Sequence, residues 1–270
     1  AALAASVELA FDYAAACEAH LNQGGLFDLA DDGHGSSTQE PELPAVTPWG
    51  VKERLSLEKT AIGFYLSGHL FDEVEREVRQ FARRPIAELS DSREPQLLAG
   101  IVGDFRVING QRGRLALFKL DDKSGVIDAR AEEALVHQHR NLLKDDEFVV
   151  VMGKVMPDRF SGGLQLNITQ VWDLPSARCR FGKFLRVAVG GKAPDVRRLL
   201  AEFPPRVEST EHGELLRGLP VRLLVERRAG GAGVMAQLQL GDQAQFFPSD
   251  AALASWVAQA DAARAAVVYE

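Results

Sequence analysis

Apolar residues recur at helical spacing in the first part of the chain. Leu3, Val7 and Phe11 follow one another at four-residue steps, which predicts a helix over residues 2–21. Asn22 and the glycines after it end this pattern. The same period returns in two further segments, residues 51–66 and residues 71–81. The start of the chain is therefore expected to be a short helical segment, with a helical connector over residues 51–96.

From residue 97 onward, the spacing of the apolar residues changes from the three- and four-residue steps of a helix to the two-residue steps of a strand. Apolar and polar residues alternate in five segments, residues 98–102, 115–120, 126–129, 148–155 and 164–168. A helical pattern over residues 132–143 separates the third strand from the fourth. Five strands with a helix at that point are the layout of an OB-fold barrel. We therefore predict a five-stranded OB-fold β-barrel over residues 97–174.

The last part of the chain mixes both periods. The pattern predicts strands over residues 184–189, 221–226, 234–240 and 265–269, the last as an edge strand, and helices over residues 194–203 and 250–258. The glycine-rich run between the second and third of these strands predicts a hairpin turn. Residues 175–270 should therefore form a small mixed α/β domain. The predicted fold class is α+β and multi-domain.

Charge is distributed unevenly along the chain. Residues 1–50 hold eight acidic residues and no lysine or arginine, although the net charge of the chain is only −7. Within them, the composition of residues 28–50 predicts an acidic flexible linker. The rest of the chain is nearly balanced, which argues against a strong nucleic-acid binder acting through its overall field. The chain begins within a helix and without Met, so we expect a piece of a longer protein.

Several classes of protein find no support in the sequence. No apolar run reaches the length of a membrane helix and no signal segment opens the chain, so we expect a cytoplasmic location and no membrane partner. Cys17 and Cys179 have no metal-ligand spacing, and the scattered histidines are expected to be solvated. The adjacent acids Asp121 and Asp122 precede Lys123-Ser124-Gly125 and are interpreted as turn residues. No catalytic, cofactor or metal site is predicted.

The first hairpin of the predicted barrel combines cations with aromatic rings. Such a combination on an OB-fold surface can bind single-stranded DNA, because cations follow the phosphates and rings stack on the bases. Alternatively, this is a solvated barrel face whose two phenylalanines point inward. The candidate DNA-binding residues are Phe105, Arg106, Arg112, Arg114, Phe118 and Lys119.

A second candidate site lies between the first helix and the linker. Residues 23–27 read Gln-Gly-Gly-Leu-Phe, so an apolar pair follows two glycines on a stretch expected to be flexible. As a peptide ligand, Leu26 and Phe27 would fill an apolar pocket while Gln23 forms a hydrogen bond at its rim. The alternative is a pair of hydrophobic residues at a helix end that folds back on Leu21.

Three motifs, in order along the chain, resemble a known family. Residues 63–69, Gly-Phe-Tyr-Leu-Ser-Gly-His, are similar to the motif that precedes the OB domain in bacterial DNA polymerase III alpha subunits. Residues 120–125, Leu-Asp-Asp-Lys-Ser-Gly, resemble a turn of that family. Residues 151–155 with residues 160–164 are similar to its G-x-V and F-S-G-G-L stretch. The resemblance covers essentially the whole chain and is best for the proteobacterial form.

The resemblance implies a division of roles. It makes Gln23, Leu26 and Phe27 contacts to the sliding clamp, so that residues 1–27 end a clamp-binding domain. It makes the barrel a binder of single-stranded template DNA, and residues 175–270 a domain that binds the clamp-loader tau subunit. The parent protein would be a DNA-directed DNA polymerase, a nucleotidyltransferase whose active site lies upstream. No cofactor is implied.

The chain departs from the family pattern in its first barrel hairpin, where the basic run is reduced to Asn-Gly-Gln-Arg at residues 109–112. We therefore expect weak DNA binding. The competing hypothesis is a free-standing OB-fold protein that binds single-stranded nucleic acid. It predicts strong, salt-dependent binding, whereas the first hypothesis is compatible with weak binding.

Overall fold

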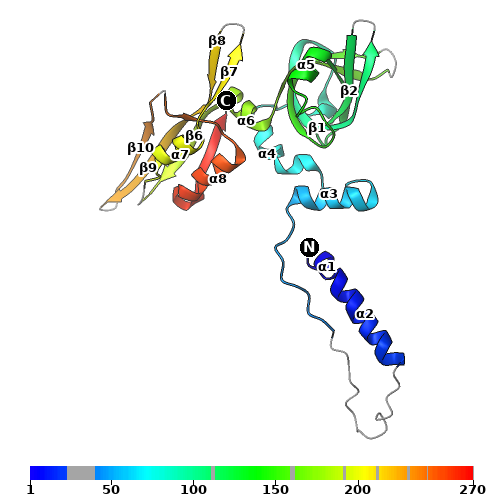
Figure 1. Ribbon diagram of the computed structural model, residues 1–270. Coiled ribbons are helices and arrows are strands. Elements are labelled where there is room, and N and C mark those ends of the chain that lie inside the picture. Colours follow the sequence, from blue (N-terminus) through cyan, green and yellow to red (C-terminus); the bar gives the residue numbers. More distant parts are fainter. Residues whose placement is uncertain are drawn as a thin grey trace. The chain divides into compact units, whose positions relative to one another are not determined.

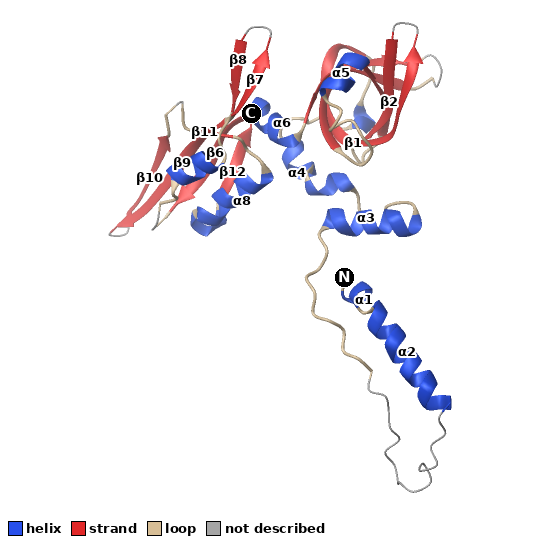
Figure 2. Ribbon diagram, in the orientation of Figure 1, coloured by secondary structure: helices blue, strands red, loops and turns tan. Residues whose placement is uncertain are grey.

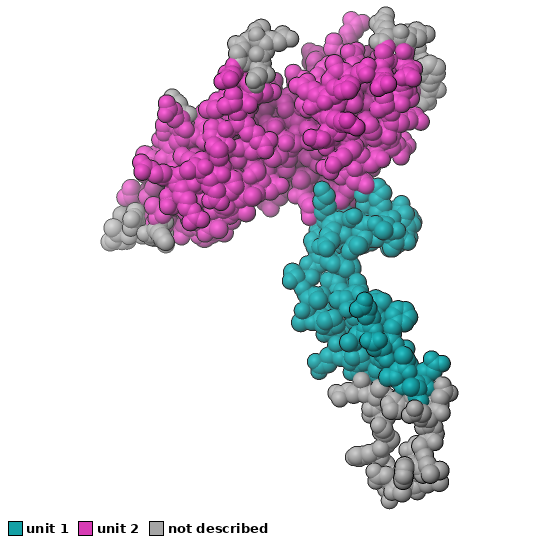
Figure 3. Space-filling view, viewed as in Figure 1, with its two compact units in different colours: residues 1–68 teal, residues 69–270 magenta. Residues whose placement is uncertain are grey.

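The structure is a computed structural model, shown in Figure 1. It describes residues 1–22, 40–110, 113–158, 162–190, 193–210, 213–229, 232–241 and 243–269. The chain divides into two compact units, residues 1–68 and residues 69–270 (Figure 3). The predicted fold class is confirmed, with N-terminal helices, a five-stranded closed barrel and a mixed α/β region. In the described part of the chain, no helix is long and apolar enough to cross a membrane.

The first unit is helical. The helix predicted over residues 2–21 is divided into α1 (Ala2–Ala5) and α2 (Val7–Asn22). Ser6 separates them, and its hydroxyl donates a hydrogen bond to the Leu3 carbonyl at 3.0 Å, a local bond that competes with the helix ladder. Helix α3 (Val51–Ile62) ends at Gly63, whose φ of 93° is in the left-handed region that favours glycine.

The family motif at residues 63–69 begins where α3 ends. The Glu58 carboxylate of α3 accepts hydrogen bonds from the backbone N–H groups of Leu66 and Ser67, at 3.0 and 2.9 Å. A hydrogen bond from Ser67 holds the pKa of Glu58 below its usual value. Part of the predicted linker, residues 28–39, lies outside the described residues, and residues 40–50 contain no helix or strand.

The second unit starts with short helical turns. The helix predicted over residues 71–81 is two pieces, η1 (Leu70–Glu73) and α4 (Glu75–Val78), and η2 (Ile86–Glu88) follows. The barrel strands are β1 (Ser92–Gly110), β2 (Gly113–Asp121), β3 (Val126–Glu132), β4 (Phe148–Pro157) and β5 (Leu164–Trp172). Helix α5 (Glu133–Gln138) lies between β3 and β4, as predicted, but is shorter than expected.

The barrel closes in the order β1-β2-β3-β5-β4, with β4 returning to β1. Within the barrel, β3 and β5 pair in parallel, and the other neighbouring strands pair antiparallel. Two glycines allow close strand contacts, because a Cβ on Gly100 would lie 2.7 Å from the Asp121 carbonyl oxygen and one on Gly153 would lie 2.4 Å from that of Asn167. Apolar side chains from all five strands fill the interior, among them Leu98, Phe118, Val151 and Leu166.

The last domain is a sheet with helices on one face (Figure 2). Its strands are β6 (Gly182–Val189), β9 (Leu219–Ala229), β10 (Ala232–Gln239) and β12 (Ala265–Tyr269), in the order β10-β9-β6-β12, so β12 is at an edge as predicted. Leu199 of α7 (Val196–Glu202) and Trp256 of α8 (Asp250–Gln259) pack on the inner face. Sequence patterns missed α6 (Leu174–Phe181), the hairpin β7 (Arg206–Thr210) and β8 (Gly213–Arg217), and β11 (Gln245–Phe246).

A polar cluster around the buried Arg178 joins helix α4 to the last domain, and we call it the joint. Arg178 of α6 donates two hydrogen bonds to Glu77 of α4, at 2.7 and 2.8 Å, and one to Asp250 of α8 at 2.6 Å. Its guanidinium also donates to the carbonyl of Pro248 at 3.0 Å. The Tyr269 hydroxyl of β12 donates to Glu77 at 2.5 Å. Helices α4, α6 and α8 and strand β12 are therefore held together by one guanidinium, two carboxylates and one hydroxyl group.

Candidate nucleic-acid interface

Strand register places a line of polar and apolar side chains across the barrel. Five residues are register partners in successive strands: Arg106 of β1, Leu117 of β2, Arg130 of β3, Asn167 of β5 and Lys154 of β4. We call this line the cation row. Side chains alternate between the two faces of a strand. Because Phe118 and Ala129, next to the row, lie in the barrel core, the row is on the outer face.

The three cations of the row are exposed and keep their charge available. Arg106, Arg130 and Lys154 are exposed, and none of them forms an ion pair with another residue of the described part of the chain. Leu117 lies between two of them and is partly exposed. The row can therefore offer positive charge to phosphates and an apolar side chain to a base.

The two cations of the predicted set in β2 are less available. Lys119 Nζ lies 2.7 Å from Asp104 Oδ2, and this hydrogen bond raises the pKa of Lys119. Arg114 Nε lies 4.0 Å from Glu133 Oε1, and both side chains are largely exposed. Arg112 lies outside the described residues. Of the predicted cations that the structure describes, Arg106 is therefore the one without an ion pair.

The two aromatic residues of the predicted set point toward the core. Phe118 is only 3% exposed and lies inside the barrel. Phe105 is half-buried and packs against the same core, with its ring centroid 6.2 Å from that of Phe118. Stacking on a base requires an exposed ring face. This corrects the prediction for Phe118, since its ring is a core element, and leaves Phe105 with only part of its surface exposed.

Sequence reasoning missed four of the five members of the cation row: Leu117, Arg130, Lys154 and Asn167. A usable signal existed for Arg130. Ile127, Ala129 and Ala131 are buried while Asp128 and Arg130 are exposed, so a strand extended past Ala129 places Arg130 outward. Its position beside Leu117 and Asn167 depends on strand register, which the sequence pattern does not give.

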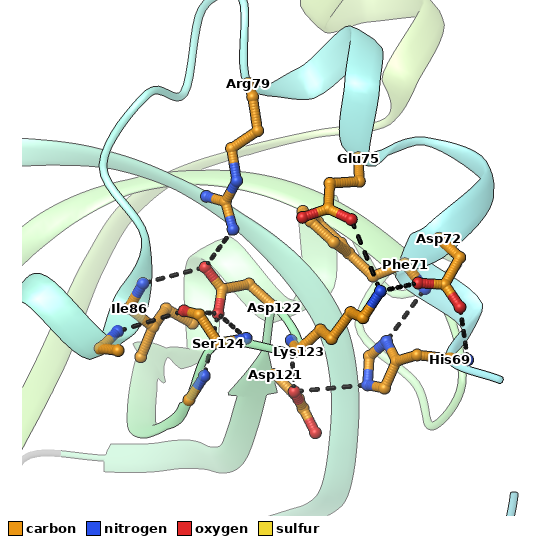
Figure 4. A network of polar contacts seen from close by, with 12 residues as sticks. His69, Phe71, Asp72, Glu75, Arg79, Ile86, Asp121, Asp122, Lys123 and Ser124 are labelled. Carbon is orange, nitrogen blue, oxygen red and sulfur yellow. Dashed lines mark hydrogen bonds and ion pairs between the residues drawn. The ribbon is translucent and has the colours of Figure 1, made fainter. Parts of the chain in front are cut away.

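Two of the family motifs meet beside the barrel (Figure 4). The ring of His69 is fixed by two contacts, because its Nδ1 accepts a hydrogen bond from the Phe71 N–H at 3.1 Å and its Nε2 lies 3.3 Å from Asp121 Oδ1. Lys123 Nζ lies 2.5 Å from Asp72 Oδ1, and this bond holds the pKa of Asp72 below its usual value. The motif ending in His69 thus binds the motif at residues 120–125.

Asp122 is the buried centre of this network, with 1% of its surface exposed. One carboxylate oxygen accepts from Ser124 and Gly125, which closes the turn predicted for these residues. The other accepts from Arg79 at 2.7 Å and from the Ile86 N–H at 2.9 Å. Burial raises the pKa of Asp122, but the hydrogen bonds outweigh it, so the pKa lies below the usual value. The role is structural.

The remaining titratable residues of the described part of the chain include two groups with shifted pKa values. No group of three or more His, Cys, Asp or Glu side chains there has the geometry to hold a metal ion. The histidines are not uniformly solvated, as His69 caps η1 and His139 is half-buried. Burial lowers the pKa of His139 and raises that of Cys179 to about 11. Gln23, Leu26 and Phe27, the predicted clamp contacts, lie outside the described residues.

Comparison with known proteins identifies relatives of the chain. Residues 97–174 match the family described as OB-fold nucleic acid binding domain. The chain is 41% identical to DNA polymerase III subunit alpha of Pseudomonas fluorescens over 166 residues, which are 61% of this chain and 14% of that protein. It is 34% identical to the subunit of Pseudomonas aeruginosa over 243 residues, which are 82% of this chain and 19% of that protein.

Over most of its length the chain is homologous to DNA polymerase III alpha subunits. The predicted resemblance is therefore confirmed. The chain spans less than a fifth of the length of these alpha subunits. Among solved structures, the small single-stranded DNA-binding protein of Streptomyces coelicolor covers 32% of this chain and 97% of its own, at 18% identity and a TM-score of 0.28. The two motifs that meet at His69 and Asp121 have a structural role in this chain.

Proposed function

We propose that this chain is a non-catalytic region of a DNA polymerase III alpha subunit that acts in DNA replication and binds single-stranded DNA on the outer face of its barrel. The cation row carries this proposal, because three exposed cations without ion-pair partners in the described part of the chain cross a barrel of a nucleic acid binding family. In this proposal, nucleotidyl transfer belongs to parts of the whole cytoplasmic protein beyond this chain.

Binding would proceed through the phosphates first. Arg106, Arg130 and Lys154 would each contact one phosphate, while Leu117 packs on a base. Arg112, Arg114, Lys119 and the exposed part of Phe105 would extend the surface along the β1–β2 hairpin. Three phosphate contacts on a single strand give a salt slope of about −2, which is compatible with weak binding.

The test is fluorescence anisotropy of a labelled oligothymidylate of about 12 nucleotides, titrated with the whole chain at several salt concentrations. Arg130→Gln is expected to weaken binding about threefold to tenfold and to reduce the salt slope by about 0.7, the value for one phosphate on a single strand. The matched control is Arg264→Gln, because Arg264 is an exposed arginine of the last domain that pairs with Glu226 and Asp261. Equal affinities of the two variants would refute the role of the cation row.

Clamp binding by Gln23, Leu26 and Phe27 stays a proposal that rests on the sequence and on the homology. The double substitution Leu26→Ala with Phe27→Ala should abolish capture of the sliding clamp in a calorimetric titration. Leu43→Ala is a matched control, since Leu43 is an apolar residue with 59% of its surface exposed outside the peptide. Unchanged capture by the double variant would contradict the assignment.

Binding of the clamp-loader tau subunit by the last domain is likewise a proposal. Exposed apolar side chains on the edge strand β10 support it, since Val234 is 65% exposed and Leu238 is 54% exposed on the same side of the strand. Val234→Ser with Leu238→Ser should prevent co-elution with tau in gel filtration. Val207→Ser with Leu216→Ser, in the β7–β8 hairpin, is the control pair. Co-elution of the β10 variant would contradict this surface.

A further inference from the structure

A cleft lies between the barrel and the last domain, where α5 and the end of β5 face the β7–β8 hairpin. Its volume is about 650 Å³, and residues of both domains line it. A space of this size accepts a ligand of nucleotide size. No residue of the cation row lines the cleft, so it is a separate feature of the surface.

The cleft carries an excess of positive charge. Arg180, Arg206 and Arg217 line it, against the carboxylates of Asp173 and Glu208. Arg217 Nε lies 2.5 Å from Glu208 Oε2, so these two charges compensate each other. Asp173 accepts a hydrogen bond from the Ser176 N–H at 2.8 Å as the cap of α6. Within the described residues, Arg180 and Arg206 form no ion pair, so their charge is available to an anion.

Aromatic rings hold both of these arginines in place. The guanidinium carbon of Arg206 lies 3.7 Å from the centroid of the Phe247 ring, and that of Arg180 lies 5.1 Å from the centroid of the Trp172 ring. A guanidinium stacked on a ring keeps its N–H donors free at the edges, where they can form a fork to a phosphate. The cleft therefore presents two oriented donors of the kind that bind phosphates.

Strand β5 connects the cleft to the cation row. Asn167 belongs to the row, while Thr169 and Gln170 of the same strand are exposed in the cleft. Two residues along a strand span about 7 Å. A single strand of DNA that crosses the barrel at Asn167 thus reaches the mouth of the cleft within a short step along its backbone. This continuity favours a phosphodiester over an unrelated acidic peptide as the occupant.

We propose that the cleft is a second subsite for single-stranded DNA, in which Arg180 and Arg206 bind phosphates of the strand that lies on the cation row. This inference rests on the proposed function of the barrel. The amide groups of Gln138 and Gln170, which line the cleft, supply donors and acceptors for the base attached to these phosphates. The subsite lengthens the bound segment beyond what the barrel alone contacts.

The test uses the whole chain and labelled oligothymidylates of about 4 to about 16 nucleotides, the range of site sizes for OB folds. Arg180→Gln with Arg206→Gln should leave the affinity for the shortest oligonucleotides unchanged. The affinity for the longest should fall about tenfold, and its salt slope should lose about 1.4, the value for two phosphates on a single strand. Arg180→Lys with Arg206→Lys keeps the charge and should restore most of the salt slope.

The outcomes separate this inference from the proposed function. If the glutamine variant binds long oligonucleotides as the wild type does while Arg130→Gln weakens them, the cleft is not a DNA subsite and the barrel proposal stands. If poly-glutamate competes with long oligonucleotides on the wild type but not on the glutamine variant, the cleft takes acidic peptides and the inference fails. If the wild type binds no oligonucleotide of any length, both proposals fail.

Discussion

The arginines of the joint and of the cation row have opposite surroundings within one compact unit. Arg178 is 4% exposed and makes four hydrogen bonds to Glu77, Asp250 and a backbone carbonyl, so it is turned toward the fold and away from a ligand. Arg106 and Arg130 are exposed and unpaired within the described residues. Removing one partner of a buried ion pair destabilises the fold, and such a charge is not accessible to a ligand. Removing an exposed, unpaired charge costs little stability, and such a charge is accessible to a ligand. In this chain, the burial and ion-pair partners of an arginine therefore indicate whether it supports the fold or is available for binding.

The largest expected effect is at the joint. Arg178→Met removes the guanidinium and leaves the Glu77 carboxylate, whose side chain is 26% exposed, with the Tyr269 hydroxyl as its remaining partner at the joint. We expect the free energy of unfolding, measured in urea, to fall by about 3 kcal/mol. Arg264→Met, at a pair of exposed carboxylates, should lower it by less than about 1 kcal/mol. Similar small losses in both variants would remove the contrast between buried and exposed arginines.

The second largest effect on stability is expected at Asp122, which is compared with its neighbour Asp121 in the turn at residues 120–125. Asp122→Ala removes the acceptor of five hydrogen bonds from a buried site and should lower the free energy of unfolding by about 2–3 kcal/mol. Asp121→Ala removes contacts to Lys123 and His69 at a side chain that is 39% exposed, and should cost less than about 1 kcal/mol. A reversed order in urea unfolding would contradict the structural role of Asp122.

Acid should weaken this turn in a defined range of pH. The pKa of Asp122 is lower in the folded chain than its ordinary value of 3.8, so its contribution to stability is complete above pH 3.8 and is lost as the pH falls through the folded-state pKa. The loss is about 1.4 kcal/mol for each pH unit between the two pKa values. Asp122→Asn should flatten the pH dependence of unfolding in this range. Asp72 and Glu58, whose pKa values are also lowered, contribute to the pH dependence that remains.

The smallest effect on stability is expected on the cation row. Arg106→Ser with Arg130→Ser should change the free energy of unfolding by no more than about 0.5 kcal/mol, because both side chains are exposed. The same variant should lose most of its affinity for single-stranded oligonucleotides. A large loss of stability together with the loss of binding would mean that the row supports the fold, and the comparison with the joint would fail.

The barrel could be predicted from sequence because each strand carries its own alternating pattern and a turn signal. The hairpin of β7 and β8 could not, since five residues per strand give too short a pattern, and its residues Val207, Leu215 and Leu216 are exposed, unlike those of a core strand. Helix α6 did leave a signal, because Asp173 caps it and Pro175 stands in its first turn. The helix was nevertheless missed, because β5 ends at Trp172 and α6 begins at Leu174, so that Leu174 was assigned to the barrel.

The candidate site was only partly predictable for a different reason. Arg106 could be predicted because it lies in the hairpin of β1 and β2, whose two strands follow each other directly in the sequence. Lys154 and Asn167 join the cation row only through the pairing of β5 with β3 and β4, which connects distant parts of the chain. The meeting of His69 with Asp121 also depends on such long-range packing. Local patterns do not contain that information.

Barrel closure has a consequence for how this region is made on the ribosome. Pairs between β1 and β2, such as Asn109 with Arg114, join residues that are close in the sequence. Gln96 of β1 pairs with Gly153 of β4, which is synthesised much later. Local pairs form early and distant pairs late. The nascent three-stranded meander therefore exposes its apolar side and two open edges until β4 and β5 emerge. Translation speed across residues 133–172 should thus influence the yield of folded protein.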